Sequence, residues 1–369
     1  MGKINELIQQ YCPDGVEYVN VGDVCDIHKG VQFNKSDMKE MGSYPVMNGG
    51  INPSGYAEVF NEDENTITIS QGGASAGYVN FLDSKFWLGA HCYALKPYSV
   101  VMNRYLYHYI KQSEITLQQC QYGAGIPALA KSTISSLEIP LPPLPVQEAI
   151  VNILDRFTVY AAELQAELQA RQQQYNYYRD TLLSFEGRDD VQWKKLGEVC
   201  KVLRGKRLTK SQLSSDGMYK VFHGGIEPIG FFDQSNREGD TTMVINVGAS
   251  AGTVGFSKEA FWSSDGCFCL SHTPILSGRF LYYYLQTKEP ILMSRVRKAG
   301  IPTLDGKVLE DIPIPIIPII EQERIISILN RFDTLVNDLS QGLPAEIEAR
   351  QQQYEYYRDQ LLTFKRKEA

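Results

Sequence analysis

The 369-residue sequence lacks any apolar run of 18 residues or more, the length that a membrane-spanning helix needs. It opens on Met-Gly-Lys-Ile-Asn-Glu, without the apolar core of a signal peptide, and Glu6 stands where myristoylation requires serine or threonine. Its seven cysteines include no CxxC pair, which argues against a zinc site or a disulfide framework. We therefore expect a cytoplasmic protein in which Cys25, Cys92, Cys200 and Cys267 are small buried residues.

Catalytic motifs are scarce as well. The segment 300–308 resembles a phosphate-binding loop, but five residues instead of four separate its glycines, and Val308 replaces the magnesium-binding hydroxyl. Ser75 and Ser250 have glycines two residues to either side, the spacing of a nucleophile elbow. However, no histidine position matches between the two halves of the chain to activate both serines. We expect tight glycine turns here, with the serines available to a phosphate, and neither an enzyme nor a metal or cofactor site.

What the sequence does contain is a second copy of itself. With a shift of 175, the Gly-Gly-Ile of 49–51 recurs at 224–226 and the Gly-Ile-Pro of 125–127 recurs at 300–302. An eleven-residue segment, Ala-Arg-Gln-Gln-Gln-Tyr-x-Tyr-Tyr-Arg-Asp, begins at Ala170 and again, with a shift of 179, at Ala349. The period is far longer than the roughly 20–50 residues of a solenoid repeat, so each copy is large enough for a domain with a connector.

Two long helices are predicted, one after each copy. From Ile150 to Phe185 the apolar residues alternate steps of four and three, which is the a/d seam of a coiled coil. A helix of about 40 residues from Val146 would span roughly 60 Å. The second seam contains a four-residue insertion around Pro344, and we expect this proline to break the helix, with Gly342 ending its first part. Two such helices pair most simply in the antiparallel direction.

The copies themselves are predicted to be rich in strands. Short alternating stretches such as 66–70 and 242–246 lie between glycine-rich turns, while tyrosine-rich segments at 105–110 and 280–285 have the spacing of helices whose tyrosines pack in a core. The fold class is therefore α/β (α+β), with two duplicated strand-rich domains that alternate with two long helices paired as an antiparallel coiled coil. The predicted segments are 1–145, 146–186, 187–320 and 321–369.

The copies differ most in the polar residues beside their matched glycines. Lys29 corresponds to Arg204, Asn48 to His223, and Ala90-His91 to Asp265-Gly266. Charge differs too: residues 1–139 contain nine basic and 14 acidic side chains, whereas residues 191–315 contain 16 basic and 12 acidic ones, although the whole chain has a net charge of −7. One scaffold thus presents two unequal recognition surfaces.

Two variable globules alternating with two nearly identical helices resemble the specificity subunit of a type I restriction–modification system. The resemblance covers essentially the whole chain, and its most telling residues are the proline-rich segments 139–148 and 314–323 and the repeats at 170–180 and 349–359. It implies that each globule is a target-recognition domain for one half of a split double-stranded DNA site. It also implies that the helices dock two methyltransferase subunits, to which restriction (translocase–nuclease) subunits are added, and that S-adenosylmethionine and ATP bind those partners and not this chain.

Within that family resemblance, the diverged turn residues become candidate DNA contacts. Polar side chains on turns can read base edges, whereas lysine, arginine and exposed backbone amides bind phosphates. We expect contacts from Lys29, Gln32, Asn34, Asn48, Asn52, Gln71 and His91 in the first copy, and from Arg204, Lys206, Arg207, His223, Glu227, Asn246 and Asp265 in the second.

Two other classes of protein stay open at this point. A coiled-coil adaptor that binds proteins through duplicated globules would explain the architecture without DNA. An enzyme with its own methyl-transfer site would need a pocket for S-adenosylmethionine. Salt-sensitive duplex binding distinguishes the first class, and binding of the methyl donor the second.

Overall fold

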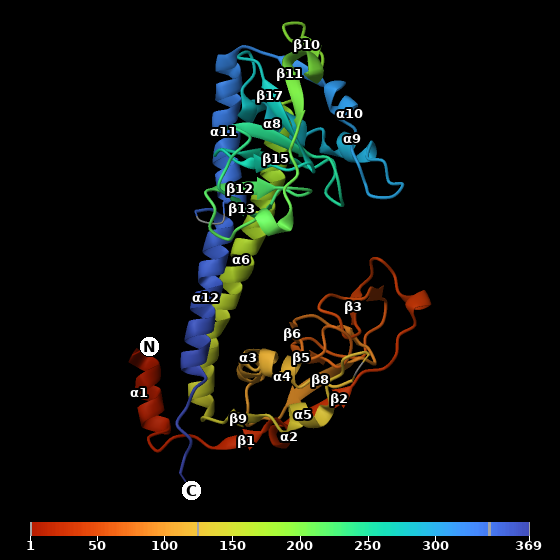
Figure 1. Ribbon diagram of the computed structural model, residues 1–369. Coiled ribbons are helices and arrows are strands. Elements are labelled where there is room, and N and C mark those ends of the chain that lie inside the picture. Colours follow the sequence, from red (N-terminus) through yellow and green to blue (C-terminus); the bar gives the residue numbers. More distant parts are fainter. Residues whose placement is uncertain (1, 124, 339–340, 369) are drawn as a thin grey trace. The chain divides into compact units, whose positions relative to one another are not determined.

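The computed structural model describes residues 2–123, 125–338 and 341–368 (Figure 1). Its contacts divide the chain into two compact units, one of Met1–Leu164 with Ile347–Ala369 and one of Gln165–Glu346. Both boundaries fall within the long helices α6 (Leu144–Leu182) and α12 (Leu343–Leu361). The four predicted segments divide the chain by sequence instead of by contact, and their boundaries stay a prediction.

In the first unit, a four-stranded antiparallel sheet forms the centre of the globule, in the order β2-β8-β5-β6. A second sheet has the order β4-β3-β7, with β3 and β7 parallel, and β1 pairs with β9. The strands are β1 (Tyr18–Asn20), β2 (Cys25–Lys29), β3 (Tyr44–Met47), β4 (Tyr56–Ala57), β5 (Thr66–Ser70), β6 (Val79–Leu82), β7 (Trp87–Leu88), β8 (Cys92–Pro97) and β9 (Glu138–Pro140). The helices are α1 (Gly2–Tyr11), α2 (Val21–Val24), the 3₁₀ turn η1 (Lys35–Asp37), α3 (Asn103–Gln112), α4 (Glu114–Gln119), α5 (Lys131–Ser135) and the first part of α6.

The second unit repeats this topology strand for strand. Its sheets have the orders β11-β17-β14-β15, β13-β12-β16 and β10-β18. The strands are β10 (Gln192–Lys195), β11 (Cys200–Arg204), β12 (Tyr219–Phe222), β13 (Pro228–Phe232), β14 (Thr241–Ile245), β15 (Val254–Ser257), β16 (Trp262–Ser263), β17 (Cys267–His272) and β18 (Pro313–Ile316). The helices are α7 (Leu196–Val199), the 3₁₀ turn η2 (Lys210–Gln212), α8 (Gly278–Gln286), α9 (Glu289–Ser294), α10 (Gly306–Glu310) and α11 (Ile319–Asn337).

The interior strand β5 of the first unit's four-stranded sheet is covered on both faces. All five residues of β5 are buried, and Ile67 and Ile69 are completely shielded from solvent. The predicted tyrosine helices are α3 and α8, and their Tyr105 and Tyr283 are also completely buried. The expectation that these tyrosines pack in the core is therefore confirmed.

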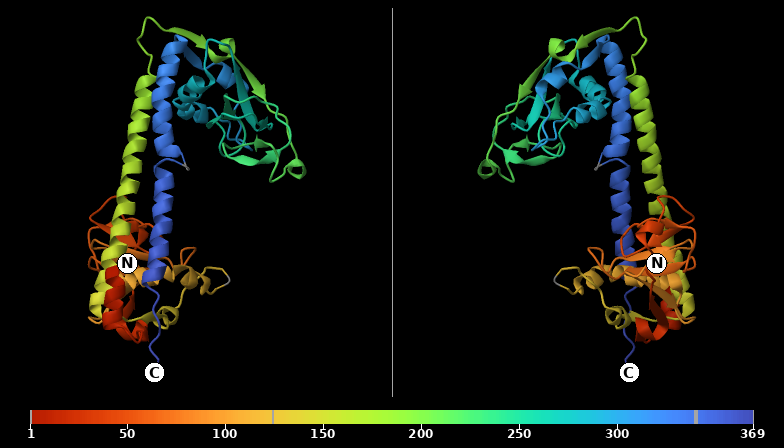
Figure 2. Two further views of the ribbon diagram at one scale, coloured as in Figure 1. Left: turned by 90° about the vertical axis from the view of Figure 1, so that its left-hand side faces the viewer. Right: turned by 90° about the vertical axis from the view of Figure 1, so that its right-hand side faces the viewer.

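The long helices pair in the antiparallel direction within each unit (Figure 2). In the first unit, Phe157 of α6 stacks on Tyr357 of α12, and Arg350 of α12 lies over Tyr160 of α6, so one helix ascends as the other descends. In the second unit, Tyr178 of α6 stacks on Phe332 of α11. The predicted fold class is confirmed.

The predicted break in the second helix is confirmed as well, because α11 ends at Asn337 and α12 begins at Leu343. The expectation that Gly342 ends the first part is wrong, because α11 ends five residues earlier and Gly342 directly precedes α12. The backbone N–H of Gly342 donates to the carbonyl of Asp338, just beyond the end of α11. Pro344 occupies the first turn of α12, where the missing N–H of a proline costs no intrahelical hydrogen bond.

A glutamine attaches each globule to its long helix. Gln147 is completely buried in α6; its side-chain Nε2 donates to the carbonyls of Val100 and Pro142, and its Oε1 accepts from the backbone N–H of Met102 at 2.7 Å. Its repeat partner Gln322 makes the same three bonds in α11, at 2.8 to 2.9 Å. Buried amides that satisfy three backbone groups are costly to lose, so each globule is fixed to its own helix.

The C-terminal segment completes the first globule. Residues after α12 run beside the start of the globule, where Val16 forms a parallel bridge with Arg366 and its backbone N–H donates to the carbonyl of Lys365. The Tyr18 hydroxyl donates to the Phe364 carbonyl at 2.9 Å. Both ends of the chain thus contribute to the first unit. None of the helices in the described parts of the chain is long and apolar enough to cross a membrane.

Candidate nucleic-acid interface

In the first unit, the ends of four strands meet at one cluster of turns. Asn48 follows β3, Gln71 follows β5 and His91 precedes β8, and hydrogen bonds connect all three: Gln71 N–H donates to the His91 carbonyl at 2.8 Å, and Asn48 Oδ1 accepts from the His91 N–H at 3.4 Å. Lys29 ends β2, and the next residue, Gly30, donates its N–H to the carbonyl of Cys92. The structure therefore brings together four of the predicted contact residues.

The second unit builds the equivalent cluster with different side chains. Arg204 ends β11, and its Nε donates to the Asp265 carbonyl at 3.3 Å. His223 follows β12, and its Nδ1 lies 3.4 Å from Asp265 Oδ1. Asn246 follows β14, and its backbone N–H donates to the Gly266 carbonyl at 3.1 Å. Four more predicted residues thus share one site, which we call the glycine-turn cluster in each unit.

Close backbone approach explains why Gly30 and its partner Gly205 are glycines. A Cβ atom at Gly30 would overlap the carbonyl oxygens of Leu88 and Gly89, and one at Gly205 would overlap those of Ser263 and Ser264. The strand end that carries Lys29 or Arg204 is thereby pressed against the turn that carries His91 or Asp265. This contact fixes the positions of the diverged polar residues, because the backbone beneath them cannot separate without losing packing.

Most predicted contact residues are accessible to a ligand. Nine are exposed and four are half-buried, whereas Asn246 is only 3% exposed and its Oδ1 accepts no hydrogen bond from the described residues. A base contact by Asn246 would require the groups that cover its side chain to move. All fourteen stay predictions: the exposed ones are Lys29, Gln32, Asn34, Asn52, His91, Arg204, Lys206, Arg207 and Glu227, and the half-buried ones are Asn48, Gln71, His223 and Asp265.

Some of the predicted residues lie beside the cluster and not within it. Asn34 donates through its side chain to Asp37 of η1, and Gln32 donates to its neighbour's carbonyl. Asn52 and Glu227 lie on the turns after β3 and β12. Lys206 is held through its backbone, since its carbonyl accepts from Trp262 Nε1 at 2.8 Å, which leaves its side chain exposed.

Sequence reasoning missed a loop that closes each cluster. The Gly-Ile-Pro loop of residues 125–127 is attached by a bond from the Gly73 N–H to the Pro127 carbonyl, and that of residues 300–302 by one from Gly248 to Pro302, both at 2.9 Å. In the second unit the loop is preceded by three exposed basic residues that were not predicted as contacts, Arg295, Arg297 and Lys298. The sequence did contain a signal for these contacts, because the basic run Arg-Val-Arg-Lys at 295–298 lies beside the matched Gly-Ile-Pro motif.

A buried charge also differs between the clusters. In the first unit Glu62 is 6% exposed and pairs with His28 Nε2 at 2.6 Å and Lys96 Nζ at 2.8 Å. The position matched to Glu62 is Arg237, whose guanidinium donates to the carbonyl of Arg204 at 2.9 Å. The second unit therefore carries positive charge directly behind Arg204, which favours anion binding there.

The segments that resemble catalytic motifs form the start of a short helix and two glycine turns. Gly306 and Lys307 begin α10, whose N-terminus is capped by the Asp305 side chain, so they do not form a loop with Gly300. The turns around Ser75 and Ser250 contain glycines with left-handed φ angles near +90° at 73, 77, 248 and 252. The part of the chain that the structure describes contains no group of three His, Cys, Asp or Glu residues suited to hold a metal ion.

The repeat-matched cysteines are buried, as expected. Burial raises the pKa of the thiols of Cys25, Cys92, Cys200 and Cys267 to about 12. These thiols are therefore protonated at neutral pH and serve as packing groups, because the thiolate is the reactive form.

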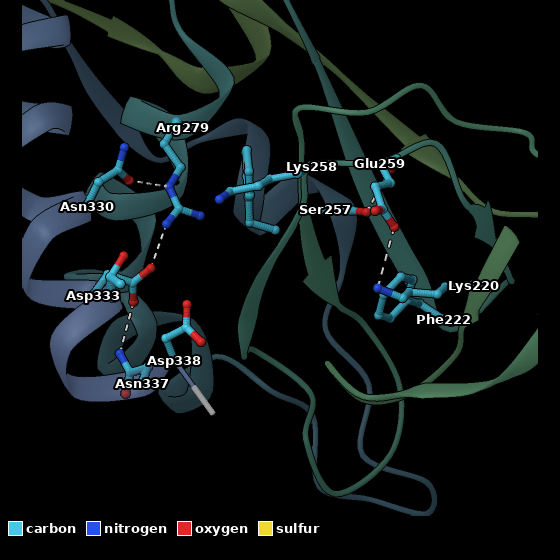
Figure 3. Close-up of a pocket in the computed structure, with 12 residues that line it drawn as sticks. Lys220, Phe222, Ser257, Lys258, Glu259, Arg279, Asn330, Asp333, Asn337 and Asp338 are labelled. Atoms are coloured by element: carbon cyan, nitrogen blue, oxygen red, sulfur yellow. Dashed lines mark hydrogen bonds and ion pairs between the residues drawn. The ribbon is translucent and has the colours of Figure 1, made fainter. Parts of the chain in front are cut away.

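The second unit also contains a surface cavity of about 450 Å³ between its globule and α11 (Figure 3). Arg279 lies on one wall and binds Asn330 at 3.0 Å and Asp333 at 2.6 Å, while Lys220 and Glu259 face each other across 3.5 Å on the other (Figure 3). In the first unit the matched Arg104 binds Asp155 in the same way, at 2.6 Å. These arginines attach the globules to the helices, so we assign the cavity wall to packing.

Comparison with known proteins agrees with the duplicated architecture. Residues 13–171 and 188–349 each match the model of the type I restriction modification DNA specificity domain. A type I restriction enzyme specificity subunit from Haemophilus influenzae, so named on a provisional basis, is 31% identical over 89% of this chain and 90% of its own length. The specificity subunit of a type I restriction enzyme from Escherichia coli is 34% identical over 64% of this chain and 66% of its own length.

A solved structure shows the same fold. The crystal structure of the S subunit of a type I restriction–modification system from M. genitalium superimposes with a TM-score of 0.71 and 22% identity, over 94% of this chain and 96% of that one. The family model covers most of the chain in two consecutive matches, in agreement with the two units and their duplicated sheets. The chain therefore belongs to the family of type I restriction–modification DNA specificity subunits.

Proposed function

We propose that this chain reads a bipartite DNA site, with one glycine-turn cluster for each half-site, for a complex whose other subunits carry out methylation and cleavage. The observation that supports this most directly is the contrast within the duplicated scaffold. The same strand ends and the same glycine contacts recur, while the residues at their tips differ: Asn48 corresponds to His223, and Ala90-His91 corresponds to Asp265-Gly266. Base readout requires such variable polar groups on a fixed backbone.

The charge of the clusters suits unequal roles in binding. The second unit presents Arg204 in its cluster, Lys206 and Arg207 beside the cluster, and Arg297 and Lys298 on the neighbouring loop, all exposed. Lys29 is the one lysine or arginine among the predicted contacts of the first unit, so this unit relies more on hydrogen bonds to base edges. We infer that phosphate binding comes mainly from the second unit, because lysine and arginine supply most of the salt-dependent affinity for DNA.

We further infer that the chain is not itself an enzyme and that its helices dock methyltransferase and restriction subunits. The exposed tyrosines Tyr177 and Tyr356 occupy matched positions in the repeated helix segment and are 67% and 62% exposed. Large exposed aromatic side chains at matched positions are suited to bind two copies of the same partner, one at each helix segment. A protein-interaction adaptor without DNA recognition is not favoured, because the matched family is a DNA specificity domain.

The division of labour can be tested with purified components. The chain alone should neither bind S-adenosylmethionine in equilibrium dialysis nor methylate or cut DNA, and it should support methylation once the methyltransferase subunit is added. Methyl transfer by the chain alone would contradict the proposal. Failure of the assembled complex to bind duplex DNA would contradict the DNA-reading role itself.

A further inference from the structure

The two Gly-Ile-Pro loops each expose an isoleucine that their surroundings do not explain. Ile126 is 76% exposed and Ile301 is 70% exposed, although both follow a glycine and precede a proline in a short loop. Single exposed apolar residues are common on protein surfaces and need no explanation by themselves. Here the same residue is exposed at the matched position in both units.

The loops belong to the candidate interface through their backbones. In the first unit Tyr122 and Ala128 pair across the loop, and the Leu129 N–H donates to the Gln71 carbonyl at 2.8 Å. In the second unit Arg297 and Thr303 pair in the same way, and the Leu304 N–H donates to the Asn246 carbonyl at 2.8 Å. Each isoleucine is therefore carried on a loop whose base is bonded to a residue of the glycine-turn cluster.

The pattern of matched and diverged residues separates two tasks at this interface. The polar side chains of the clusters differ between the units, as expected if each reads a different base sequence. The loop isoleucines are identical, so they suit a feature that every half-site shares, and a stack of base pairs is such a feature. The flanking residues fit a nucleic-acid partner, since Arg297 and Lys298 supply positive charge in the second unit and Tyr122 an exposed ring in the first.

We propose that Ile126 and Ile301 are apolar wedges, each of which enters the base stack of the DNA bound to its unit and partly unstacks one base step. Insertion removes an exposed apolar side chain from water, which offsets the loss of base stacking. The β-branched isoleucine is stiff, and the proline after it restricts the loop, so little conformational freedom is lost on insertion. This inference rests on the proposed DNA-reading function and adds a deformation of the duplex to it.

The test uses the complex of this chain with its methyltransferase subunits and duplexes that contain the recognised site, with 2-aminopurine placed at successive positions in each half. Unstacking raises 2-aminopurine fluorescence. The unaltered complex should raise it at one position in each half-site. Ile126→Ala should abolish most of the rise in one half and leave the other half unchanged, and Ile301→Ala should do the reverse.

Matched variants separate a wedge from a general effect on folding or binding. Ile126→Leu and Ile301→Leu retain an apolar side chain of the same volume and should retain most of the rise. Ile115→Ala on α4 and Ile291→Ala on α9 remove isoleucines that are 69% and 48% exposed in the same two units, and should change nothing. Loss of a wedge should change DNA affinity by less than about tenfold, because burial of the isoleucine is largely offset by the loss of base stacking.

The outcomes distinguish the two proposals. Site-specific binding with no fluorescence rise at any position, or a rise that persists in both alanine variants, would overturn the wedge and leave the DNA-reading function standing. Absence of site-specific duplex binding by the unaltered complex would overturn the DNA-reading function as well.

Discussion

The basic strand end of the second unit offers a quantitative test of where phosphates bind. Replacing Arg204, Lys206 and Arg207 with alanine removes three exposed side chains at and beside the glycine-turn cluster. The loss of packing is small, because Lys206 is held through its backbone and Arg204 makes one side-chain bond to a carbonyl at 3.3 Å. The fold should therefore be retained, and the change in DNA binding can be attributed to lost phosphate contacts.

The magnitude follows from counterion release. Each phosphate contact contributes about 0.9 to the slope of log affinity against log salt concentration, so three lost contacts reduce the slope by up to about 2.7. Between about 50 and 200 mM salt, a slope difference of that size changes the ratio of the affinities of the unaltered complex and the variant by a factor of about 40. The variant should thus bind much more weakly than the unaltered complex at low salt, and the two affinities should approach each other as salt increases.

The assay is a salt titration of duplex binding by the complex, followed by fluorescence anisotropy. A control with the same loss of charge replaces Lys194, Lys195 and Lys307, which lie on β10 and α10, where Lys195 pairs with Asp311 at 2.9 Å. The control should leave the slope nearly unchanged, since β10 pairs with β18 in a separate sheet and both Lys195 and Lys307 pair with Asp311. An unchanged slope in the Arg204 variant, or equal changes in both, would refute the assignment of this cluster to the DNA backbone.

Two further predictions concern the helices and the attachment of the first globule. Adding one Ala-Glu-Leu-Gln unit to the tandem pair at 162–169 lengthens α6 by about 6 Å and should widen the unspecified gap between half-sites by about one or two base pairs; methylome sequencing that shows an altered half-site, or an unchanged gap with full activity, would contradict this role. Burial lowers the pKa of His108 below its ordinary value of 6.5 and outweighs the hydrogen bond to Asp155, which raises this pKa. The unfolded chain therefore binds a proton more readily than the folded one. The stability of the first unit should therefore fall as pH drops below about 6.5, and urea unfolding should show a weaker decline for His108→Gln; equal declines would refute it.

Much of the architecture could be predicted because its causes are local. The a/d seam from Ile150 predicted α6, and the four-residue insertion around Pro344 predicted the break between α11 and α12. The periodic tyrosines predicted α3 and α8 and their burial. These features depend on periodicity and on backbone chemistry, both of which are visible in a single sequence.

The attachment of globules to helices was not predicted, because it depends on interactions between residues distant in sequence. Gln147 and Gln322 occupy matched positions, yet only the structure shows that each satisfies three backbone groups. The same is true of Arg104 and Arg279, which bind carboxylates on the helices. The alignment of the two copies did contain a signal. A polar residue that recurs at the same position on an otherwise apolar helix face is a candidate for a buried hydrogen bond.

The candidate interface was predicted at the level of its turns and less well in detail. Divergence beside matched glycines pointed to Asn48, His91, Arg204 and Asp265, which the structure places at strand ends that meet. It gave no means to see that Asn246 is buried. The Gly-Ile-Pro loops were not selected, because the candidate contacts were chosen among residues that differ between the copies and the loop residues match. A matched residue can nevertheless contact a feature that both half-sites share.

The central claim, that each globule reads its own half of the site, is tested most directly by exchanging residues 16–139 for the corresponding segment of another family member. The structure favours these junctions, because Val19 pairs with Ile139 where β1 meets β9, so both ends of the exchanged segment lie at one edge of the globule. The measurement is the methylome of cells that carry the chimera with its methyltransferase partner. Our account predicts that one half of the methylated site changes while the other half stays the same. Simultaneous change of both halves, or of neither in an active complex, would contradict it.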